Sequence, residues 1–466
     1  EAVDASANGQ IIGVAAGTYK ENVVVDKDIT IEGIGEVNIV GTFRSDNSVP
    51  SGTTVGEFLQ TATSYSGAAG AGITVAADGV TLTNLNISAF LHGVSFAGVS
   101  GLTLNQIDIS DSVYGIAKLN DGDATIFRMN GGSIVDSYQG FTVDSTGLAG
   151  ATFDDVILDG VTFEDLTEKG FYADHLSNAQ LLNLVMNNVG EFGRGPAFGP
   201  ASQTGEFGAG IDINVKYGDY ENILIDGFAF TDVGSSSGPD SVPLDFGAAI
   251  VVRARDDAPS YSGNRASLDN VTISDGTIDG TSTGVRLGEP GKANATTTNV
   301  VVTNVVVTDY DVGVFDNVST QVLTVNGTGG DDILVAAATT TGPGAINGLG
   351  GNDYLHAGAG DDTLDGGADT DTAAYDGNRA EFTIAETRGA NGLVTAFHGV
   401  TDNVSAGGDE GTDSFTSIER VEFADVTLDV AQPVQLFDAS DNLIGTFSTI
   451  QEALVASAHG HHVRVS

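Results

Sequence analysis

The sequence predicts an all-β protein: a long parallel β-helix, then a smaller parallel β-roll, then a small β-rich cap. Two observations predict this fold class. Short runs of alternating apolar and polar residues, bounded by Gly, Asn and Asp, recur through the first two thirds of the chain, and a period of two is typical of strands. A block rich in glycine and aspartate then repeats every nine residues, which is a period of coiled β architectures.

The composition fits this fold class. The 466 residues include 63 acidic and 17 basic side chains, for a net charge of -46, with 64 glycines and no cysteine. The negative charge argues against nucleic acid or an anionic membrane surface as a partner, and because the sequence has no transmembrane run we expect no membrane insertion. The 41% of hydrophobic residues are enough to bury a core. We expect a secreted bacterial protein, extracellular or at the cell surface. Because no leader follows Glu1, its export signal is expected outside this chain.

The two ends of the chain resemble each other. With an offset of 451, residues 1–15 and 452–466 are identical at seven of fifteen positions, and Val3/Leu454 and Ile12/Val463 are conservative replacements. We interpret the chain as slightly more than one unit of a tandem array, cut inside a motif. Copies of the chain itself, in tandem or in an assembly, are therefore expected partners.

Residues 1–325 are predicted to form the β-helix. Runs such as Val23–Gly33, Gly79–Ile87 and Gly101–Ile109 alternate apolar and polar residues, and no helix of useful length is expected before Thr449–Ala456. A polar residue recurs before an aliphatic one in successive runs. We expect these polar residues to stack in one column, where amides can hydrogen-bond to each other: Asn84, Gln106, Asp155, Asn183, Asn222, Asn270 and Asn304.

A second column is expected from a glycine that precedes an apolar residue. Its spacing of 22 to 40 residues fits a basic turn of 22–25 residues with loops inserted in the middle turns. A β-sandwich is the alternative, but it would need hairpin turns of the Asn-Gly type. The members of the column are Gly93, Gly115, Gly140, Gly170, Gly210, Gly284 and Gly313, with Ala249 in the same role.

The opening of the chain resembles a known superfamily. Ala15-Ala-Gly-Thr-Tyr-Lys-Glu-Asn-Val followed by Ile29-Thr-Ile-Glu-Gly is similar to the first turn of pectin-lyase-like right-handed β-helices, which include pectate lyases, pectin methylesterases and alginate C5-epimerases. The resemblance covers about residues 1–320. It implies a right-handed β-helix, whereas an activity has to be argued from the site.

Residues 348–374 form three consecutive nonapeptides, and an earlier copy begins at Gly327. They match the calcium-binding RTX pattern G-G-x-G-x-D-x-U-x. Glycine permits the tight turn and lets carbonyl groups point inward, aspartate supplies a hard oxygen ligand, and the aliphatic residue two positions later fills the core. Calcium is therefore the expected cofactor. The predicted site residues are Asp332, Gly351, Asp353, Gly360, Asp362 and Asp371.

The third nonapeptide departs from the pattern, with Asp369 in place of a glycine and Ala373 in place of a large aliphatic residue. The chain from Tyr375 onward resembles the β-rich segment that often trails RTX repeats and is expected to cap the roll. The expected domains are residues 1–325, the β-helix; 326–375, the calcium-binding β-roll; 376–430, the β-rich flanking segment; and 431–466, a linker and the start of the next tandem unit.

Basic residues are scarce, yet eight of the 17 lie between Lys169 and Lys292, where the turns are longest. Aligning the turns on their glycines brings a set of polar side chains onto one outer face. There an arginine could neutralise a uronate carboxylate while Tyr, His or Lys moves a proton. The candidate catalytic residues are Tyr172, Asp174, His175, Asp212, Arg253 and Arg286, with Lys216 beside them; Arg194, Arg255 and Arg265 complete the basic set.

Two functions fit these observations. In the first, the chain is a calcium-stabilised repeat unit of a large secreted surface protein: a surface layer, a filament or an adhesin. In the second, it is a calcium-dependent polyuronate C5-epimerase or lyase module that acts on an acidic polysaccharide, and a cell-surface glycan is a possible ligand in either case. The segment Gly170–His175 has the residue types of the epimerase motif but neither its order nor its proline, which favours the structural function.

Overall fold

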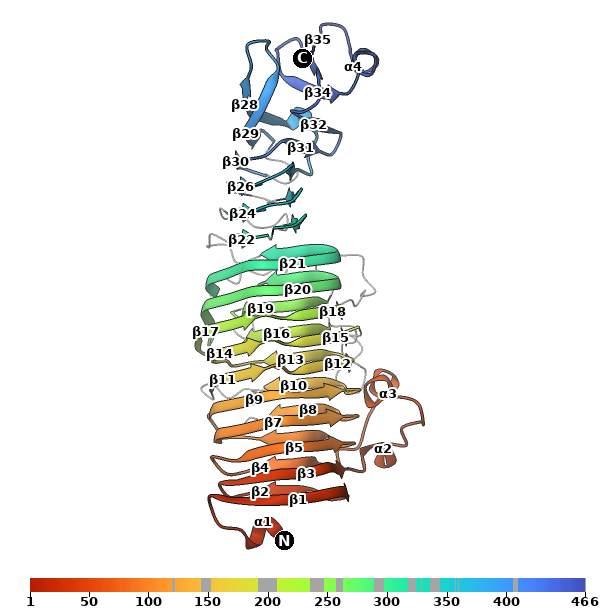
Figure 1. The fold of residues 1–466 in the computed structure, drawn as a ribbon, viewed down its shortest axis with the longest axis vertical. Helices are drawn as coiled ribbons and strands as arrows, with labels where there is room; N and C mark the ends of the chain where they lie inside the picture. Colours follow the sequence, from red (N-terminus) through yellow and green to blue (C-terminus); the bar gives the residue numbers. More distant parts are fainter. Residues whose placement is uncertain are drawn as a thin grey trace. The chain divides into compact units, whose positions relative to one another are not determined.

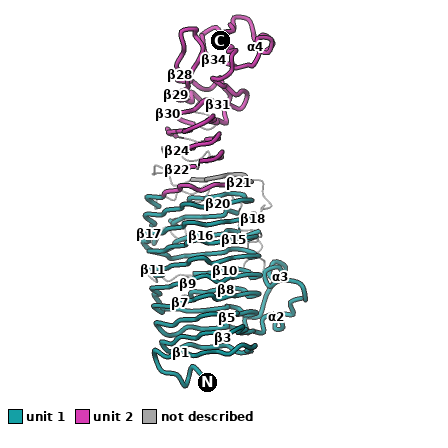
Figure 2. Tube along the Cα trace, in the orientation of Figure 1, with its two compact units in different colours: residues 1–300, 308–311 teal, residues 301–307, 312–466 magenta. Residues whose placement is uncertain are grey.

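The computed structural model describes residues 1–119, 122–143, 152–191, 208–234, 247–256, 263–288, 297–316, 324–327, 329–335, 344–356, 358, 360–404 and 410–465. The chain is predominantly β, as predicted (Figure 1). It divides into two compact units, residues 1–300 with 308–311 and residues 301–307 with 312–466 (Figure 2). The division falls within β21 (Thr297–Asp316), upstream of the boundary expected at residue 325.

Unit 1 is a stack of turns in which each strand pairs in parallel with its counterpart one turn later. One column of strands runs β2 (Val23–Val25), β4 (Ala71–Val75), β6 (His92–Phe96), β8 (Tyr114–Lys118), β10 (Gln139–Val143), β13 (Lys169–Ala173), β16 (Ala209–Val215), β19 (Ala248–Ala254) and the end of β20 (Ser267–Leu287). Parallel pairing at this separation requires the chain to return to the same side after each turn.

The other strands of unit 1 complete each turn. Early turns use one long strand: β1 (Gln10–Tyr19), β3 (Ile29–Val40), β5 (Thr81–Ser88), β7 (Ser100–Ser110) and β9 (Ala124–Val135). Later turns divide that strand in two: β11 (Phe153–Asp159) with β12 (Thr162–Leu166), β14 (Ser177–Leu182) with β15 (Val185–Val189), and β17 (Asp219–Asp226) with β18 (Ala229–Val233).

The expected column of polar residues is in fact two columns. All seven residues have φ between 50° and 60°, the left-handed conformation that Asn, Asp and Gly tolerate best. One column contains Asp155, Asn222 and Asn270. Five residues after each of them comes a second left-handed residue, and these second residues, Gly160, Gly227 and Asp275, form the other column. Asn84 and Gln106 belong to this second column. The prediction of a single column was wrong because Asn and Asp mark the left-handed backbone conformation, and each turn contains more than one residue in that conformation.

The hydrogen-bonded amide ladder does form in the earlier of the two columns. The Nδ2 of Asn222 donates to Oδ1 of Asn178 at 2.8 Å, and the Nδ2 of Asn270 donates to Oδ1 of Asn222 at 2.7 Å. Each bond joins one turn to the next.

The glycine column is confirmed by the strand register, which aligns Gly93, Gly115, Gly140, Gly170, Gly210, Ala249 and Gly284. Its cause is steric. A Cβ added to Gly115 would lie 2.5 Å from Cγ2 of Ile134 and 2.8 Å from the carbonyl oxygen of Gly140. Adjacent turns therefore approach too closely at this column for most side chains.

The core of unit 1 is apolar, with phenylalanines of consecutive turns in contact. The rings of Phe96 and Phe127 are stacked with centroids 5.4 Å apart, and those of Phe141 and Phe171 meet edge to face, also at 5.4 Å. Three short helices, α1 (Ala2–Ala5), α2 (Phe43–Asp46) and α3 (Val55–Thr61), lie outside the stack. The expectation of no helix before the C-terminus missed α3, whose signal is the Thr54/Glu57 capping box.

Unit 2 contains a second, narrower coil with two strands per turn. One column is β22 (Thr324–Asn326), β24 (Ala345–Asn347), β26 (Thr363–Asp365) and β30 (Thr412–Thr416); the other is β23 (Ile333–Val335), β25 (Tyr354–His356), β27 (Thr372–Ala374) and β31 (Arg420–Phe423). The hairpin of β28 (Phe382–Arg388) and β29 (Val394–Asp402), preceded by a 3-10 turn at Arg379–Glu381, is inserted before the last turn, and β32 (Val426–Asp429) pairs antiparallel with β31.

The segment expected to be a linker is folded. Antiparallel strands β33 (Val434–Phe437), β34 (Leu443–Phe447) and β35 (His462–Val465) form a sheet with β33 in the middle, accompanied by α4 (Ile450–Ala456). Val434, Leu436 and Phe437 are buried there, so this stretch has the apolar core that a linker lacks.

Candidate functional site

The narrow coil of unit 2 places an acidic side chain where the chain enters six of its strands: β23, β25, β26, β27, β30 and β31. In every case the acid precedes the buried apolar residue of the strand by two positions: Asp332 before Leu334, Asp353 before Leu355, Asp362 before Leu364, Asp371 before Ala373, Asp413 before Phe415 and Glu419 before Val421. Because successive strands alternate between the two columns, acids nine residues apart lie on opposite sides of the coil.

One column joins the acids of alternate nonapeptides. The backbone N–H of Asp332 donates to Oδ1 of Asp353 at 2.8 Å, and the backbone N–H of Asp353 donates to Oδ1 of Asp371 at 2.8 Å. The N–H of Asp371 in turn donates to Oε2 of Glu419 at 3.0 Å. Asp353, Asp371 and Glu419 thus each accept a bond from the backbone of the preceding turn with one carboxylate oxygen.

The second column repeats this arrangement on the other side. Oδ1 of Asp362 accepts from the backbone N–H of Gly344 at 2.5 Å, and Oδ1 of Asp413 accepts from the N–H of Asp362 at 2.8 Å. Here Oδ2 of Asp413 also has a donor, the hydroxyl of Tyr375 at 2.7 Å.

Three of these carboxylates keep a buried oxygen with no hydrogen-bond partner: Oδ2 of Asp353, of Asp362 and of Asp371. The residues are 2%, 4% and 0% exposed. Burial raises the pKa of Asp353 and of Asp362 to about 6 and that of Asp371 above its usual value. A buried, unpaired carboxylate oxygen is costly, and a cation at this oxygen would remove that cost.

The glycines shape the space around these oxygens. A Cβ on Gly348 would collide with Oδ2 of Asp353, and a Cβ on Gly366 would collide with Oδ2 of Asp371. Gly351 and Gly360 have φ of 108° and 130°, which a side chain rarely adopts. The donor set is thus hard oxygen in a cradle that only glycine leaves open, and it fits calcium.

No group of three or more His, Asp or Glu side chains converges among the described residues in a way that could hold a metal ion. The nonapeptide pattern predicts that backbone carbonyl groups of the glycine turns would supply further calcium ligands beside Asp353.

All six predicted metal-site residues lie in these turns. Sequence reasoning missed Asp413 and Glu419, which lie on the last turn of the coil beyond the β28–β29 hairpin. The signal was present as the two-residue step from acid to apolar residue, in Asp413/Phe415 and Glu419/Val421. The insertion of the hairpin breaks the nine-residue period and conceals it.

The strand register confirms the alignment of turns used for the candidate catalytic residues of unit 1, but all of them except Tyr172 are buried rather than exposed on the expected outer face. The register aligns Tyr172 with Asp212, Asp212 with Val251 and Val251 with Arg286. Arg253 aligns with Asn214. Two of the basic positions named from the sequence, Arg194 and Lys292, lie outside the described residues.

These side chains form a buried network of ion pairs. Lys169 Nζ lies 2.6 Å from Oδ2 of Asp212, and Arg253 lies 3.3 Å from the same oxygen. Asp212 is 0% exposed and Arg286 1% exposed. Burial alone would raise the pKa of Asp212, but the charges of Arg253 and Lys169 outweigh it and hold that pKa well below its usual value.

Tyr172 is a hydrogen-bond donor in this network. Its hydroxyl donates to Oδ1 of Asp174 and accepts from Nζ of Lys216 at 2.9 Å, and Lys216 is paired with Asp174 at 2.7 Å. Burial, then the negative charges of Asp174 and Asp212, raise the pKa of Tyr172 well above 10. A tyrosine held in its neutral form is poorly suited to abstract a proton. His175 is 1% exposed, with its ring 6.4 Å from that of Tyr220.

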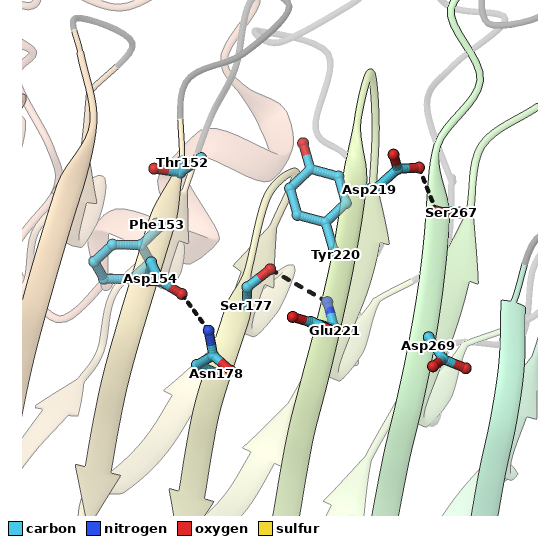
Figure 3. A pocket seen from close by; sticks show the side chains of 10 residues that line it. All are labelled: Thr152, Phe153, Asp154, Ser177, Asn178, Asp219, Tyr220, Glu221, Ser267 and Asp269. Carbon is cyan, nitrogen blue, oxygen red and sulfur yellow. Dashed lines mark hydrogen bonds between the residues drawn. The ribbon is translucent and has the colours of Figure 1, made fainter.

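A cavity of about 460 Å³ lies beside the starts of β14, β17 and β20 (Figure 3). None of the candidate catalytic residues lines it. Three of its carboxylates already accept hydrogen bonds: Asp154 from Asn178 at 2.7 Å, Asp219 from Ser267 at 2.5 Å and Asp269 from Asn299 at 2.7 Å. Its lining would repel a polyuronate, because it includes the carboxylates of Asp154, Asp219, Glu221 and Asp269.

A family model for the RTX calcium-binding nonapeptide repeat, in four copies, matches residues 340–373. This repeat is a calcium-binding motif, and its match covers the turns that carry Asp353, Asp362 and Asp371. No curated protein matches the chain. Among the described residues, no helix has both the length and the hydropathy needed to cross a membrane.

Among solved structures, the chain is similar to "Crystal structure of PfbA, a surface adhesin of Streptococcus pneumoniae", at 13% identity and a TM-score of 0.31 over 84% of this chain and 91% of that chain. A similarity at this level supports no statement about fold or function.

Proposed function

We propose that the chain is a calcium-stabilised repeat unit of a large secreted bacterial surface protein, such as a surface layer, a filament or an adhesin. In this proposal unit 1 is a right-handed parallel β-helix of the pectin-lyase-like type, and residues 326–375 open a calcium-binding β-roll. The parallel pairing of each strand with its counterpart one turn later supports both assignments.

The observation that carries the proposal is the set of buried carboxylate oxygens without partners in Asp353, Asp362 and Asp371. Without a cation, these turns hold several negatively charged carboxylates in a buried environment, where they repel one another. The chain's net charge of -46 adds to that repulsion. Calcium outside the cell would neutralise the carboxylates of these turns. Because that calcium is met only after export, the roll would fold only once the chain has left the cell.

The proposal is tested by calcium titration with thermal unfolding and limited proteolysis. We expect calcium to raise the melting temperature and to protect residues 327–430, and a chelator to reverse both effects. Asp353→Asn should lose part of the stabilisation. Asp369→Asn removes the same charge from an exposed position of the same roll and should keep it. Unchanged circular dichroism and protease resistance in chelator would refute the proposal.

The enzymatic alternative, a polyuronate C5-epimerase or lyase, is less well supported. Lys169, Arg253 and Lys216, which would have to bind a uronate carboxylate, are paired with Asp212 and Asp174 instead. Incubation with alginate or polygalacturonate and calcium decides the question: unsaturated uronate absorbance or inversion at C5 by NMR, lost in Arg253→Ala, would establish the enzyme.

A further inference from the structure

The two ends of the chain fold into the same local structure. Helices α1 and α4 both end at a serine, and in each the hydroxyl bonds back to the helix: Ser6 Oγ donates to the carbonyl of Val3 at 2.7 Å, and Ser457 Oγ donates to that of Leu454 at 2.8 Å. These residues are 451 positions apart.

The turn after each helix is also the same. Gly9 and Gly460 have φ of 79° and 90°. The backbone N–H of Ala7 donates to Oε1 of Gln10 at 2.7 Å, and the N–H of Ala458 donates to Nδ1 of His461 at 3.0 Å.

The return bonds match as well, from the N–H of Gln10 to the carbonyl of Ala7 at 3.2 Å and from the N–H of His461 to that of Ala458 at 3.1 Å. Two different side chains therefore make the same bond at equivalent positions, which identifies the two segments as copies of one motif.

At the C-terminal end the motif has further strands. There β35 pairs antiparallel with β33, so that Val463 faces Leu436 and His462 faces Phe437, with the two rings stacked at 5.7 Å. At the N-terminal end the equivalent of β35 is the start of β1. Among the described strands β1 pairs with β3 alone, and Ile11, the counterpart of His462, is 68% exposed.

We propose that residues 433–451 of one copy, which comprise the β33–β34 hairpin and the first two residues of α4, cap the stack of turns that begins at β1 in a following copy. The free edge of β1 would pair with β33 of that copy, with Ile11 opposite Phe437, Ile12 opposite Leu436 and Val14 opposite Val434. This inference rests on the proposed tandem function and names the surface through which consecutive units join.

The same pairing gives the junction a continuous apolar layer. On β33, Val434 and Leu436 are each 2% exposed, and they would lie beside Ile12 and Val14, which are half-buried on β1. Backbone pairing along an open edge together with a matching apolar face is the usual basis of strand addition. It would also protect an edge that is otherwise open to unwanted pairing.

The test adds a second copy of residues 433–451 directly before Glu1 of the full chain, as residue 451 precedes Glu452. Because the chain has no tryptophan, Ile11→Trp provides a single fluorescent reporter at the free edge. In the extended chain we expect its emission to shift to the blue and its quenching by acrylamide to fall, since the indole would stack on the added Phe437.

Two controls accompany the test. Val185→Trp places the reporter on β15 at a residue that is 42% exposed, and its emission should be the same in both chains. Leu436→Lys in the added segment alone should abolish the shift. Hydrogen exchange of the extended chain without any reporter should show slower exchange across residues 11–14.

An Ile11→Trp reporter that stays equally exposed, together with unchanged exchange of β1, would overturn the inference. The calcium dependence of melting, measured on the same samples, tests the proposed function separately, because the roll lies far along the chain from β1. If melting depends on calcium but the tryptophan at position 11 stays exposed in the extended chain, the proposed cap is refuted and the proposed calcium-dependent function is not.

Discussion

The hydroxyl of Tyr375 donates a hydrogen bond to Oδ2 of Asp413 at 2.7 Å. Asp413 continues the column of Asp362, and Oδ2 is the oxygen that has no partner in Asp362. Tyr375 therefore occupies on the last turn the position that a cation would occupy on earlier turns. Its ring lies against Phe382, with centroids 5.3 Å apart, so the end of this column is also anchored in the core of the flanking segment.

Tyr375→Phe is expected to destabilise the roll in chelator by about 1–3 kcal/mol, the usual cost of leaving a buried acceptor without a donor. Chemical denaturation measures the change. Tyr354→Phe is the matched control, because its hydroxyl makes only a 3.3 Å bond to Glu422 at a half-buried site. Equal effects of the two substitutions would show that the Asp413 bond has no special role.

The pH dependence of the roll's stability should differ with and without calcium. Burial raises the folded-state pKa of Asp353 and Asp362 to about 6 and that of Asp413 to about 7. Between pH 4 and 7 the folded chain then binds more protons than the unfolded chain, so its stability falls as pH rises. In chelator we expect a higher melting temperature at pH 5 than at pH 8. With saturating calcium this difference should vanish or reverse, since protons compete with the metal. A chelated sample that melts higher at pH 8 would contradict the raised pKa values.

Gly115→Ala should destabilise unit 1 by about 1–3 kcal/mol, as overpacking of a tight contact does. Its Cβ would meet Cγ2 of Ile134 at 2.5 Å and the carbonyl of Gly140 at 2.8 Å. Gly160→Asn is the control: nothing lies within 4 Å of its Cβ, its φ is 65°, and asparagine is common at such positions. Thermal unfolding of the two variants should therefore differ clearly.

Asp212→Asn should cost about 3–5 kcal/mol, because it removes the buried carboxylate that pairs with both Lys169 and Arg253. Asp155→Asn removes a partner of Arg128 at 2.7 Å, but both side chains are partly exposed, and the expected cost is about 0–1 kcal/mol. Denaturant titration compares them. A small effect of Asp212→Asn would mean that the network is open to water and available to a ligand.

Much of the stacking could be predicted from residue type. In this column, glycine recurs where two turns come too close for a side chain. The positions of Gly93, Gly115 and Gly140 in the sequence therefore predict how the strands of successive turns align. That register is enough to place Tyr172 beside Asp212 from the sequence alone.

Other features could not be predicted because they depend on contacts between distant residues. The burial of Asp212 follows from its pairing with Lys169 and Arg253, which lie 43 and 41 residues away. Asp413 joins the column of Asp362 only because the β28–β29 hairpin folds out of the coil. The polar column is split in two because two positions of each turn have a left-handed backbone, and asparagine occurs at both, so residue type alone does not distinguish them.

The left-handed residues of unit 1 also reveal where the chain can vary. Asp155 and Asp165, Asn178 and Asn188, and Asn222 and Asp232 are left-handed pairs that lie ten residues apart in successive turns. From Asn188 to Asn222 the chain runs 34 residues, whereas from Asp165 to Asn178 it runs only 13. In these turns, the segment between the two left-handed residues has a constant length of ten residues, whereas the segment that leads to the next turn varies in length. One extra residue between Asn178 and Asn188 should therefore disrupt the register of every turn that stacks upon it.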